Sequence, residues 1–244
     1  MLFCFFRGTD SYTTKGEKQI TMQFRHEVKH EINRADMMIL RQRLRAVMHP
    51  DPHAINGVYV IRSLYFDNAD DKALREKLSG CAEREKYRIR LYNHNSDLIH
   101  LERKYKNRSL GYKDSVSLTV DQARAIAAGD YDFPGWQDND ILRTFRAKML
   151  EQGLRAKVIV DYEREPFIFD AGNVRVTLDY NIRSGLSCTD FLNPDCTTVP
   201  IFGDPIILEV KWDNYLPDVI RDAVQLGGRR NGAFSKYAAC RMFD

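Results

Sequence analysis

Charged and apolar residues alternate along two neighbouring stretches of the chain, EKYRIRLYN at 85–93 and LIHLERKYK at 98–106. Successive side chains of a β-strand point to opposite faces of its sheet, so each set lines one face. The apolar face carries Tyr87, Ile89, Leu91, Ile99, Leu101 and Tyr105. The charged face carries Lys86, Arg88, Arg90, His100, Glu102, Lys104 and Lys106. The pattern therefore predicts two strands of a sheet that has one apolar and one ionic face.

The same alternation returns in other parts of the chain, separated by helical patterns. In the run QFRHEVKHEI at 23–32, charged residues again occupy every second position. Further strands are predicted over residues 58–66, 112–117, 157–165, 166–169, 174–180 and 206–213. Helices are predicted after Asn33, after Asp67 or Asn68, and over residues 121–128, 138–152 and 217–226. Residues 184–205, which are rich in Gly, Ser, Thr, Asn and Pro, are expected to form a loop.

About eight antiparallel strands with few long crossovers favour a closed barrel. The interior of a small barrel is normally filled with apolar side chains. Here helices are the better cover for the apolar faces, which leaves the ionic faces to line a wet tunnel. The expected fold class is therefore α+β: an antiparallel β-barrel tunnel of about eight strands with a polar interior and helices packed on the outside.

The domain organisation is simple. Residues 1–21 open with the short apolar run MLFCFF and continue without a period, so they are expected to be a disordered extension. Residues 22–244 contain no repeat and no linker, which favours a single domain. No apolar run approaches the roughly 18 residues that a bilayer span needs. The 5 cysteines are odd in number and form no CxxC pair, so reduced thiols in a cytoplasmic protein are expected.

Charge narrows the partner class. A net charge of +3 is too small to suggest non-specific binding of nucleic acid, so any basic site must be local. The cations predicted to face the tunnel are Lys29, Arg88, Arg90, Lys104, Lys113, Arg164, Arg175, Lys211 and Lys236. The carboxylates predicted to face it are Glu27, Glu102, Asp179 and Glu209. Such an excess of buried cations is costly without a ligand, and a chain of phosphates supplies the missing charge. The alternative is an ordinary solvated outer face.

The carboxylates suggest a metal. Clustered Glu and Asp suit Mg²⁺ or Mn²⁺, which prefer oxygen ligands and commonly bridge substrate phosphates. Glu209 and Glu27 are the better candidates, with Glu102 and Asp179 behind them, and a salt bridge is the competing role for each. No HExxH, Walker loop or nucleophile elbow is present in the sequence.

The ordered motifs resemble a known family. The chain contains RHEVK, SLYFDN, EKYRIRLY, LERKYK, GYKDSV, DYER, VRVTLD, LEVKWD and FSKY. They follow the order seen in the VTC domain, the polyphosphate polymerase domain of the vacuolar transporter chaperone complex, over roughly residues 22–242. That domain is one of the triphosphate tunnel metalloenzymes, a CYTH-like superfamily. The resemblance implies that ATP's triphosphate is held in a tunnel while Mn²⁺ or Mg²⁺ assists transfer of the γ-phosphate to a growing chain.

The resemblance also implies residue roles. Residues implied in catalysis are Lys29, Arg88, Arg90, Lys104, Arg164 and Lys236. Lys113, Arg175 and Lys211 are implied in substrate binding, and Glu209 in metal binding. Two departures matter: the first Glu of an ExExK start is replaced by Arg25, and Gly232-Ala233 stands where polymerising relatives can carry a lysine. The chain also lacks the membrane helices and SPX domain of the eukaryotic complex, so a membrane-protein partner would be encoded separately.

Three functions follow from these patterns. The first is an ATP-dependent polyphosphate polymerase, with ATP and inorganic polyphosphate or triphosphate as partners. The second is a hydrolase of the same fold that cleaves triphosphate or nucleoside triphosphates. The third is a non-catalytic polyphosphate-binding module, which keeps the cations but has no need of metal-binding carboxylates.

Overall fold

The computed structural model describes residues 25–107, 110–229 and 231–242, and the predicted extension 1–21 lies outside them. The strands are β1 (His26–Ile32), β2 (His49–Pro50), β3 (Tyr59–Asp67), β4 (Glu83–Tyr92), β5 (Asn95–Asn107), β6 (Leu110–Leu118), β7 (Arg155–Phe169), β8 (Val174–Ser184), β9 (Val199–Pro200) and β10 (Ile206–Trp212). The α-helices are α1 (Arg34–Val47), α2 (Lys72–Leu78), α3 (Val120–Ala127), α4 (Asp140–Glu151), α5 (Asp218–Val224) and α6 (Lys236–Arg241). None of these helices is long and apolar enough to cross a membrane.

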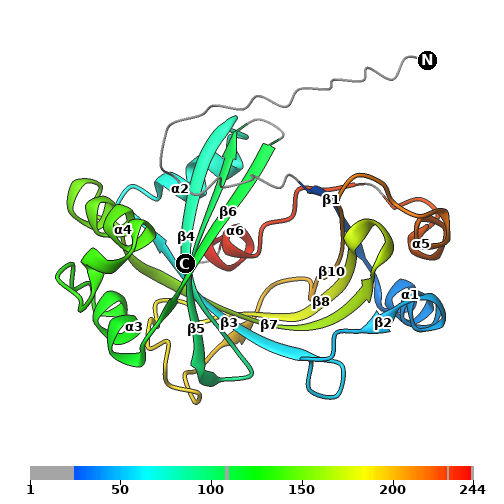
Figure 1. Cartoon of the computed structure of the whole chain (residues 1–244), viewed down its shortest axis with the longest axis horizontal. Coiled ribbons are helices and arrows are strands. Elements are labelled where there is room, and N and C mark those ends of the chain that lie inside the picture. The colour runs from blue at the N-terminus through cyan, green and yellow to red at the C-terminus, as the bar shows by residue number, and fades with distance from the viewer. Residues whose placement is uncertain (1–24, 108–109, 230, 243–244) are drawn as a thin grey trace.

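Eight strands form one strongly curled antiparallel sheet, in the order β1-β10-β8-β7-β3-β4-β5-β6 (Figure 1). The short β2 and β9 add to β7 and β8. β1 and β6 are the two edges of this path, and the described strands show no pairing between them. Lys104 of β5 reaches across the gap to Glu27 of β1, with Nζ 3.4 Å from Oε2. The α+β fold class with a curled antiparallel sheet and outer helices is thus confirmed.

The convex face of the sheet is apolar and covered by helices, as the alternating pattern predicts. At one end Phe66, Ile89 and Leu101 are buried with Phe145 of α4. At the other end Leu208 of β10 is buried in a separate cluster with residues of α1 and α5. Because the apolar positions face outward into these layers, the charged positions of the same strands must face the concave side.

Helix starts match the sequence signals. Asn33 forms a capping box with Asp36 at the start of α1. Before α2, the buried Asp67 accepts backbone hydrogen bonds from Ala73 and Leu74 at 2.9 and 3.1 Å, and Asn68 accepts one from Lys72 at 2.9 Å. Asp67 and Asn68 therefore both accept hydrogen bonds from the first backbone amides of α2, although they precede the helix by about one turn.

Several elements differ from the sequence prediction: the short β2 and β9 were not predicted, β9 lies inside the predicted loop 184–205, and β7 and α6 differ as follows. β7 runs without a break through Pro166, which was expected to separate two strands, because Pro166 lies opposite Thr177 in the β7–β8 pairing and its carbonyl accepts from Asp51 N at 3.2 Å. The helix α6 was not predicted; Ser235 caps it by accepting from Ala238 N. It packs on the concave side, where Tyr237 is buried with inward-facing apolar residues of β3, β7 and β8.

Candidate functional site

Glu209 of β10 lies at the centre of one group of charges on the concave face. Its side chain is 6% exposed, and Oε1 is 3.1 Å from Nζ of both Lys29 and Lys211. Its Oε2 is 3.5 Å from Nη2 of Arg164. Burial alone would raise the pKa of Glu209, but Lys211, Lys29 and Arg164 hold it well below its usual range. Glu209 therefore stays ionised and forms ion pairs with three cations.

Asp179 of β8 extends this group toward α6. Its side chain is fully buried and accepts two parallel bonds from Arg164, Nε at 2.6 Å and Nη2 at 2.7 Å. Lys236, the first residue of α6, contacts the same carboxylate with Nζ at 2.5 Å from Oδ2. The bidentate arrangement fixes the guanidinium plane of Arg164, so its position does not depend on a ligand.

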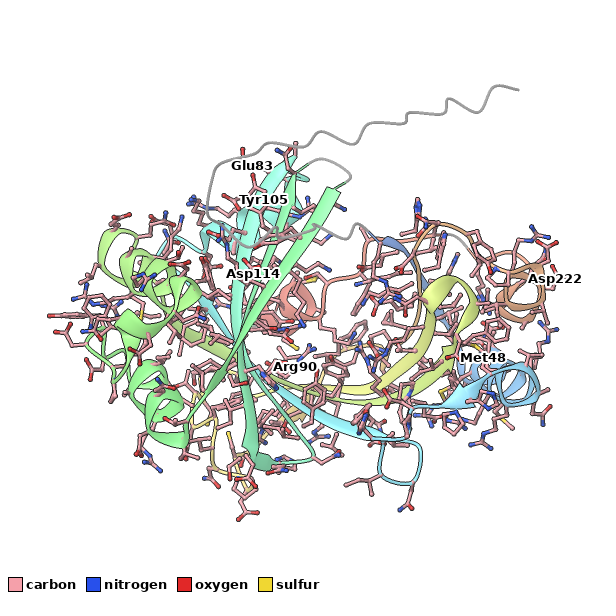
Figure 2. The ribbon with its side chains drawn as sticks, viewed as in Figure 1. Met48, Glu83, Arg90, Tyr105, Asp114 and Asp222 are labelled. Atoms are coloured by element: carbon pink, nitrogen blue, oxygen red, sulfur yellow. The ribbon has the colours of Figure 1, made fainter. Side chains whose placement is uncertain are left out.

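Glu102 of β5 is the centre of a second group, built on β4, β5 and β6. Arg88 Nη2 lies 2.5 Å from its Oε2, Lys113 Nζ 2.6 Å from its Oε1, and Arg90 Nη1 3.7 Å from Oε2. Burial opposes ionisation of Glu102, yet these cations hold its pKa far below the usual range. In Figure 2, Glu83 and Tyr105 mark the tips of β4 and β5, and Arg90 lies well below them.

Glu27 extends the first group across the gap to β5, where Lys104 lies opposite Lys113 of the second group. Its Oε1 is 2.8 Å from Lys29 Nζ, and its Oε2 is 3.4 Å from Lys104 Nζ. Together the two groups contain eight of the nine predicted cations and all four predicted carboxylates, namely Lys29, Arg88, Arg90, Lys104, Lys113, Arg164, Lys211 and Lys236 with Glu27, Glu102, Asp179 and Glu209. Cations therefore outnumber carboxylates two to one.

Arg175 is the predicted residue that lies apart. Its Nη2 contacts Oδ2 of Asp51 at 3.2 Å, and its side chain is 38% exposed. Asp51 follows the short β2, which pairs with β7 beside β8. Asp51 thus holds Arg175 at the margin of the concave face. The distance between the two residues along the chain gave no sign of this contact.

Tyrosines complete the site, and the sequence prediction missed them. Tyr65 Oη accepts from Arg88 Nη1 at 2.8 Å, and Tyr162 Oη accepts from Arg90 Nη2 at 3.0 Å. Burial would raise the pKa of Tyr65, but Arg88 and Arg90 together lower it to about 8. Residues 58–66 look mainly apolar in sequence. The hydroxyl groups of residues 59, 63 and 65 share one face of this strand, and this pattern could have indicated that the face is polar.

Lys86 adds an uncompensated cation at the rim. It lies directly opposite Lys104, which in turn lies opposite Lys113, so three lysines stand in register across β4, β5 and β6. Its Nζ is 3.4 Å from Ser235 Oγ and 5.0 Å from the centre of the Tyr237 ring. No described carboxylate forms an ion pair with it. Like charges directly opposite are destabilising, so this row is better suited to an anionic ligand than to the free protein.

Replacing Lys86 should move ligand-free stability and ligand response in opposite directions. Burial lowers the pKa of Lys86 to about 8, and Lys77 and Arg84 act in the same direction. Below pH 8 the folded state therefore carries a charge that it disfavours, since the unfolded pKa is about 10.4. We expect Lys86→Met to raise the Tm without ligand by a few degrees at pH 7, with the gain shrinking between about pH 8 and 10.

The same variant should show a smaller rise in Tm with tripolyphosphate, because one anion-binding charge is lost. Lys72→Met, on the exposed first turn of α2, is the matched control and should change neither quantity. A variant that is less stable without ligand, yet responds to tripolyphosphate as the parent does, would remove Lys86 from the anion site.

Glu27 and Glu209 are the carboxylates that fit a divalent cation. Both contact the Lys29 ammonium, at 2.8 and 3.1 Å, so their oxygens already converge on one shared cation. Glu102 lies in the other group, and Asp179 is held by Arg164 and Lys236. The described residues form no group of three or more potential metal ligands. A two-carboxylate site of this kind suits Mg²⁺ or Mn²⁺, which keep water and substrate phosphates as their other ligands.

The chain is similar to known proteins in sequence and in fold. The sequence model of the VTC domain matches residues 24–243. No curated protein matches the chain. A solved structure from Bacillus halodurans, of a protein proposed to be an adenylate cyclase, has a TM-score of 0.51 at 12% identity and covers 83% of this chain and 85% of its own. The PH1819 protein of Pyrococcus horikoshii gives 0.45 at 13% identity, covering 88% and 93%. The Mimivirus capping enzyme triphosphatase gives 0.41 at 12% identity, covering 86% and 87%.

Proposed function

The chain belongs to the VTC domain family, and from that premise we propose that it transfers the γ-phosphate of ATP to a growing polyphosphate chain. One observation carries the proposal: eight cations share four buried or half-buried carboxylates on the concave face. Each carboxylate pairs with two or three cations, so N–H groups of these cations remain free to donate to a ligand. A polyanion supplies the charge that the network lacks, which a neutral or cationic substrate does not.

The cations differ in the work they can do. Arg88, Arg90 and Arg164 present planar guanidinium groups that match phosphate oxygens in pairs. Lys29, Lys104 and Lys236 are compact point charges that neutralise charge without fixing a plane. Transfer of a phosphoryl group depends mainly on positioning and on neutralisation of charge around an in-line displacement. These side chains are therefore the ones that we propose to hold and align the triphosphate.

A divalent cation, when held by Glu209 and Glu27, would neutralise further charge on the phosphates. The protein's part would be to keep both carboxylates ionised, and the pKa of Glu209 lies well below its usual range for the reasons given above.

Hydrolysis of a triphosphate or nucleoside triphosphate is the second candidate, favoured by the segment beside β1. Gly232 N donates to Lys29 O at 2.8 Å, so this segment borders the cation group. It carries Gly232-Ala233 where the resemblance associates polymerising relatives with a lysine. Part of the concave face is also apolar and covered by α6, so less of the polar surface remains for a polymer to bind.

Incubation of the full chain with ATP and Mn²⁺ tests the proposal. We expect ADP to exceed free orthophosphate, with the missing phosphate recovered as chains on a gel. Orthophosphate equal to ADP, with no chains, would support the hydrolase instead. If ATP is not turned over but tripolyphosphate raises the Tm, the protein is a non-catalytic polyphosphate-binding module.

Adding a cation beside β1 should lengthen the product. We expect the parent to make short chains and Ala233→Lys to make longer ones, because a charge next to Lys29 slows release of the polymer. The gain should shrink as salt rises, since exposed charges are screened over about 10 Å at 0.1 M ionic strength. Ala233→Met, which adds similar length without charge, should leave chain length unchanged. If Ala233→Lys only slows orthophosphate release, the polymerase proposal fails.

A further inference from the structure

Two thiols meet in the loop between β8 and β9, on residues that the proposed activity does not use. Cys188 Sγ lies 2.7 Å from Cys196 Sγ, although both are reduced. That separation is close to the roughly 2.05 Å of a disulfide bond. We propose that Cys188 and Cys196 form a reversible intrachain disulfide by exchange with a low-molecular-weight disulfide. The cysteine spacing alone predicted free thiols, because no CxxC pair marks this site.

The loop already holds the two cysteines in place. Cys188 N donates to Gly185 O at 2.9 Å, and Cys196 N donates to Asn193 O at 3.2 Å. Between them, Phe191 is 1% exposed and packs into the cluster beneath α3 and α4. Each sulfur is therefore carried by a hydrogen-bonded turn, and the segment joining them is anchored by a buried ring. Bond formation requires only a small approach of the two sulfurs.

The two thiols differ in access, which divides their roles. Cys188 is partly exposed, whereas Cys196 is only 9% exposed. The buried guanidinium of Arg62 lies close enough to interact with the charge of either sulfur as a thiolate. Arg62 is also held by Asp161, with Nη2 2.8 Å from Oδ2. A reagent in solution thus meets Cys188 first, and Cys196 is placed to resolve the product.

The exchange balances in two steps. The Cys188 thiolate attacks one sulfur of the external disulfide, which forms a mixed disulfide at Cys188 and releases one external thiolate. Cys196 then loses its proton and attacks Cys188 Sγ, which closes the Cys188–Cys196 bond and releases the second external thiolate. The chain loses two hydrogens and two electrons, and the external disulfide gains them as two thiols. Excess external thiol reverses both steps.

The bond would close a loop that already contacts the convex side of the sheet. Asn193 O accepts a hydrogen bond from Arg62 of β3, and Arg62 pairs with Asp161 of β7. The loop therefore contacts two central strands through one side chain. Closing a loop of this length in the unfolded chain should raise the Tm of the oxidised protein by roughly 5–10 °C over the reduced form.

A peptide-mapping experiment tests the proposal directly. The full chain is equilibrated with oxidised glutathione, free thiols are alkylated, and the protein is cleaved after Lys and Arg. Both cysteines fall in one peptide, residues 184–211. We expect that peptide to be unalkylated and lighter than the reduced peptide by two hydrogens. Further cleavage before Asp190 or Asp195 should leave two fragments that separate only after reduction.

Variants separate the steps. Cys196→Ser should trap glutathione at Cys188, whereas Cys188→Ser should leave Cys196 unmodified and abolish the oxidation-dependent rise in Tm. Cys81→Ser, which removes an exposed thiol elsewhere, should retain that rise. Parent protein in which both cysteines of peptide 184–211 are alkylated, or in which glutathione stays on Cys188, overturns the proposal. Neither result depends on turnover of ATP, so failure here leaves the proposed function untouched.

Discussion

Glu209→Gln is expected to lower turnover of ATP in the presence of Mn²⁺ by about 10²–10³-fold, the size seen when one group that stabilises transition-state charge is lost. Gln keeps the size of the side chain and one acceptor oxygen but cannot hold a divalent cation by charge. Binding of triphosphate without metal should persist or tighten, because Lys29, Lys211 and Arg164 lose a carboxylate that competes with phosphate for them. Opposite effects on turnover and on binding mark a metal-binding role.

The measurements are initial rates of ADP formation at saturating ATP and calorimetric titration with tripolyphosphate in a chelating buffer. Glu163→Gln is the matched control: Glu163 lies on the outer face of β7 and bonds to Asn181 Nδ2 at 2.7 Å. It should leave both quantities as in the parent. If Glu209→Gln turns over ATP at the parental rate, Glu209 serves only as a salt-bridge partner.

Joint replacement of Arg88 and Arg90 by Ala should abolish most of the stabilisation that tripolyphosphate confers. At a ligand concentration about 100 times Kd, linkage stabilises a protein by about 2.7 kcal/mol. For a chain of this size that corresponds to a rise in Tm of roughly 5–10 °C in the parent. The variant lacks two of the guanidinium groups on the concave face, so its Tm should barely respond.

The variant will also be less stable without ligand, because Glu102 loses two of its three cations in a buried setting. The informative quantity is therefore the ligand-induced change in Tm, compared with that of Arg62→Ala. Arg62 is 2% exposed and paired with Asp161 on the convex side, so its removal also breaks a buried ion pair. Arg62→Ala should lower the Tm yet respond fully to tripolyphosphate. A double variant that responds like the parent would show that the concave face does not bind the ligand.

Strand periodicity was enough to assign the ionic face, because a two-residue repeat fixes which side chains share a side. Lys29, Arg88 and Glu209 all face the concave side for that reason. Periodicity within a strand does not show what lies across it. The row formed by Lys86, Lys104 and Lys113 depends on the register of three strands, which hydrogen bonding between strands determines.

The other differences have similar physical causes. Tyr65 and Tyr162 have rings that suit an apolar strand and hydroxyls that suit an ionic site, so composition cannot assign them to one face. Arg175 points to Asp51 because β2, only two residues long, brings that carboxylate beside β8. The helix α6 has a capping serine but too few residues for a helical period to be visible.

The pairing of β1 with β10 has a kinetic consequence. It joins Lys29 near the start of the described chain to Glu209 near its end, and Lys236 follows later still. Contacts between residues so far apart in sequence form slowly, because a long loop must close before they are made. A nascent or refolding chain can therefore build β3, β4 and β5 well before the proposed anion site is complete. In a refolding experiment, recovery of tripolyphosphate binding should lag behind recovery of the circular dichroism signal from the sheet.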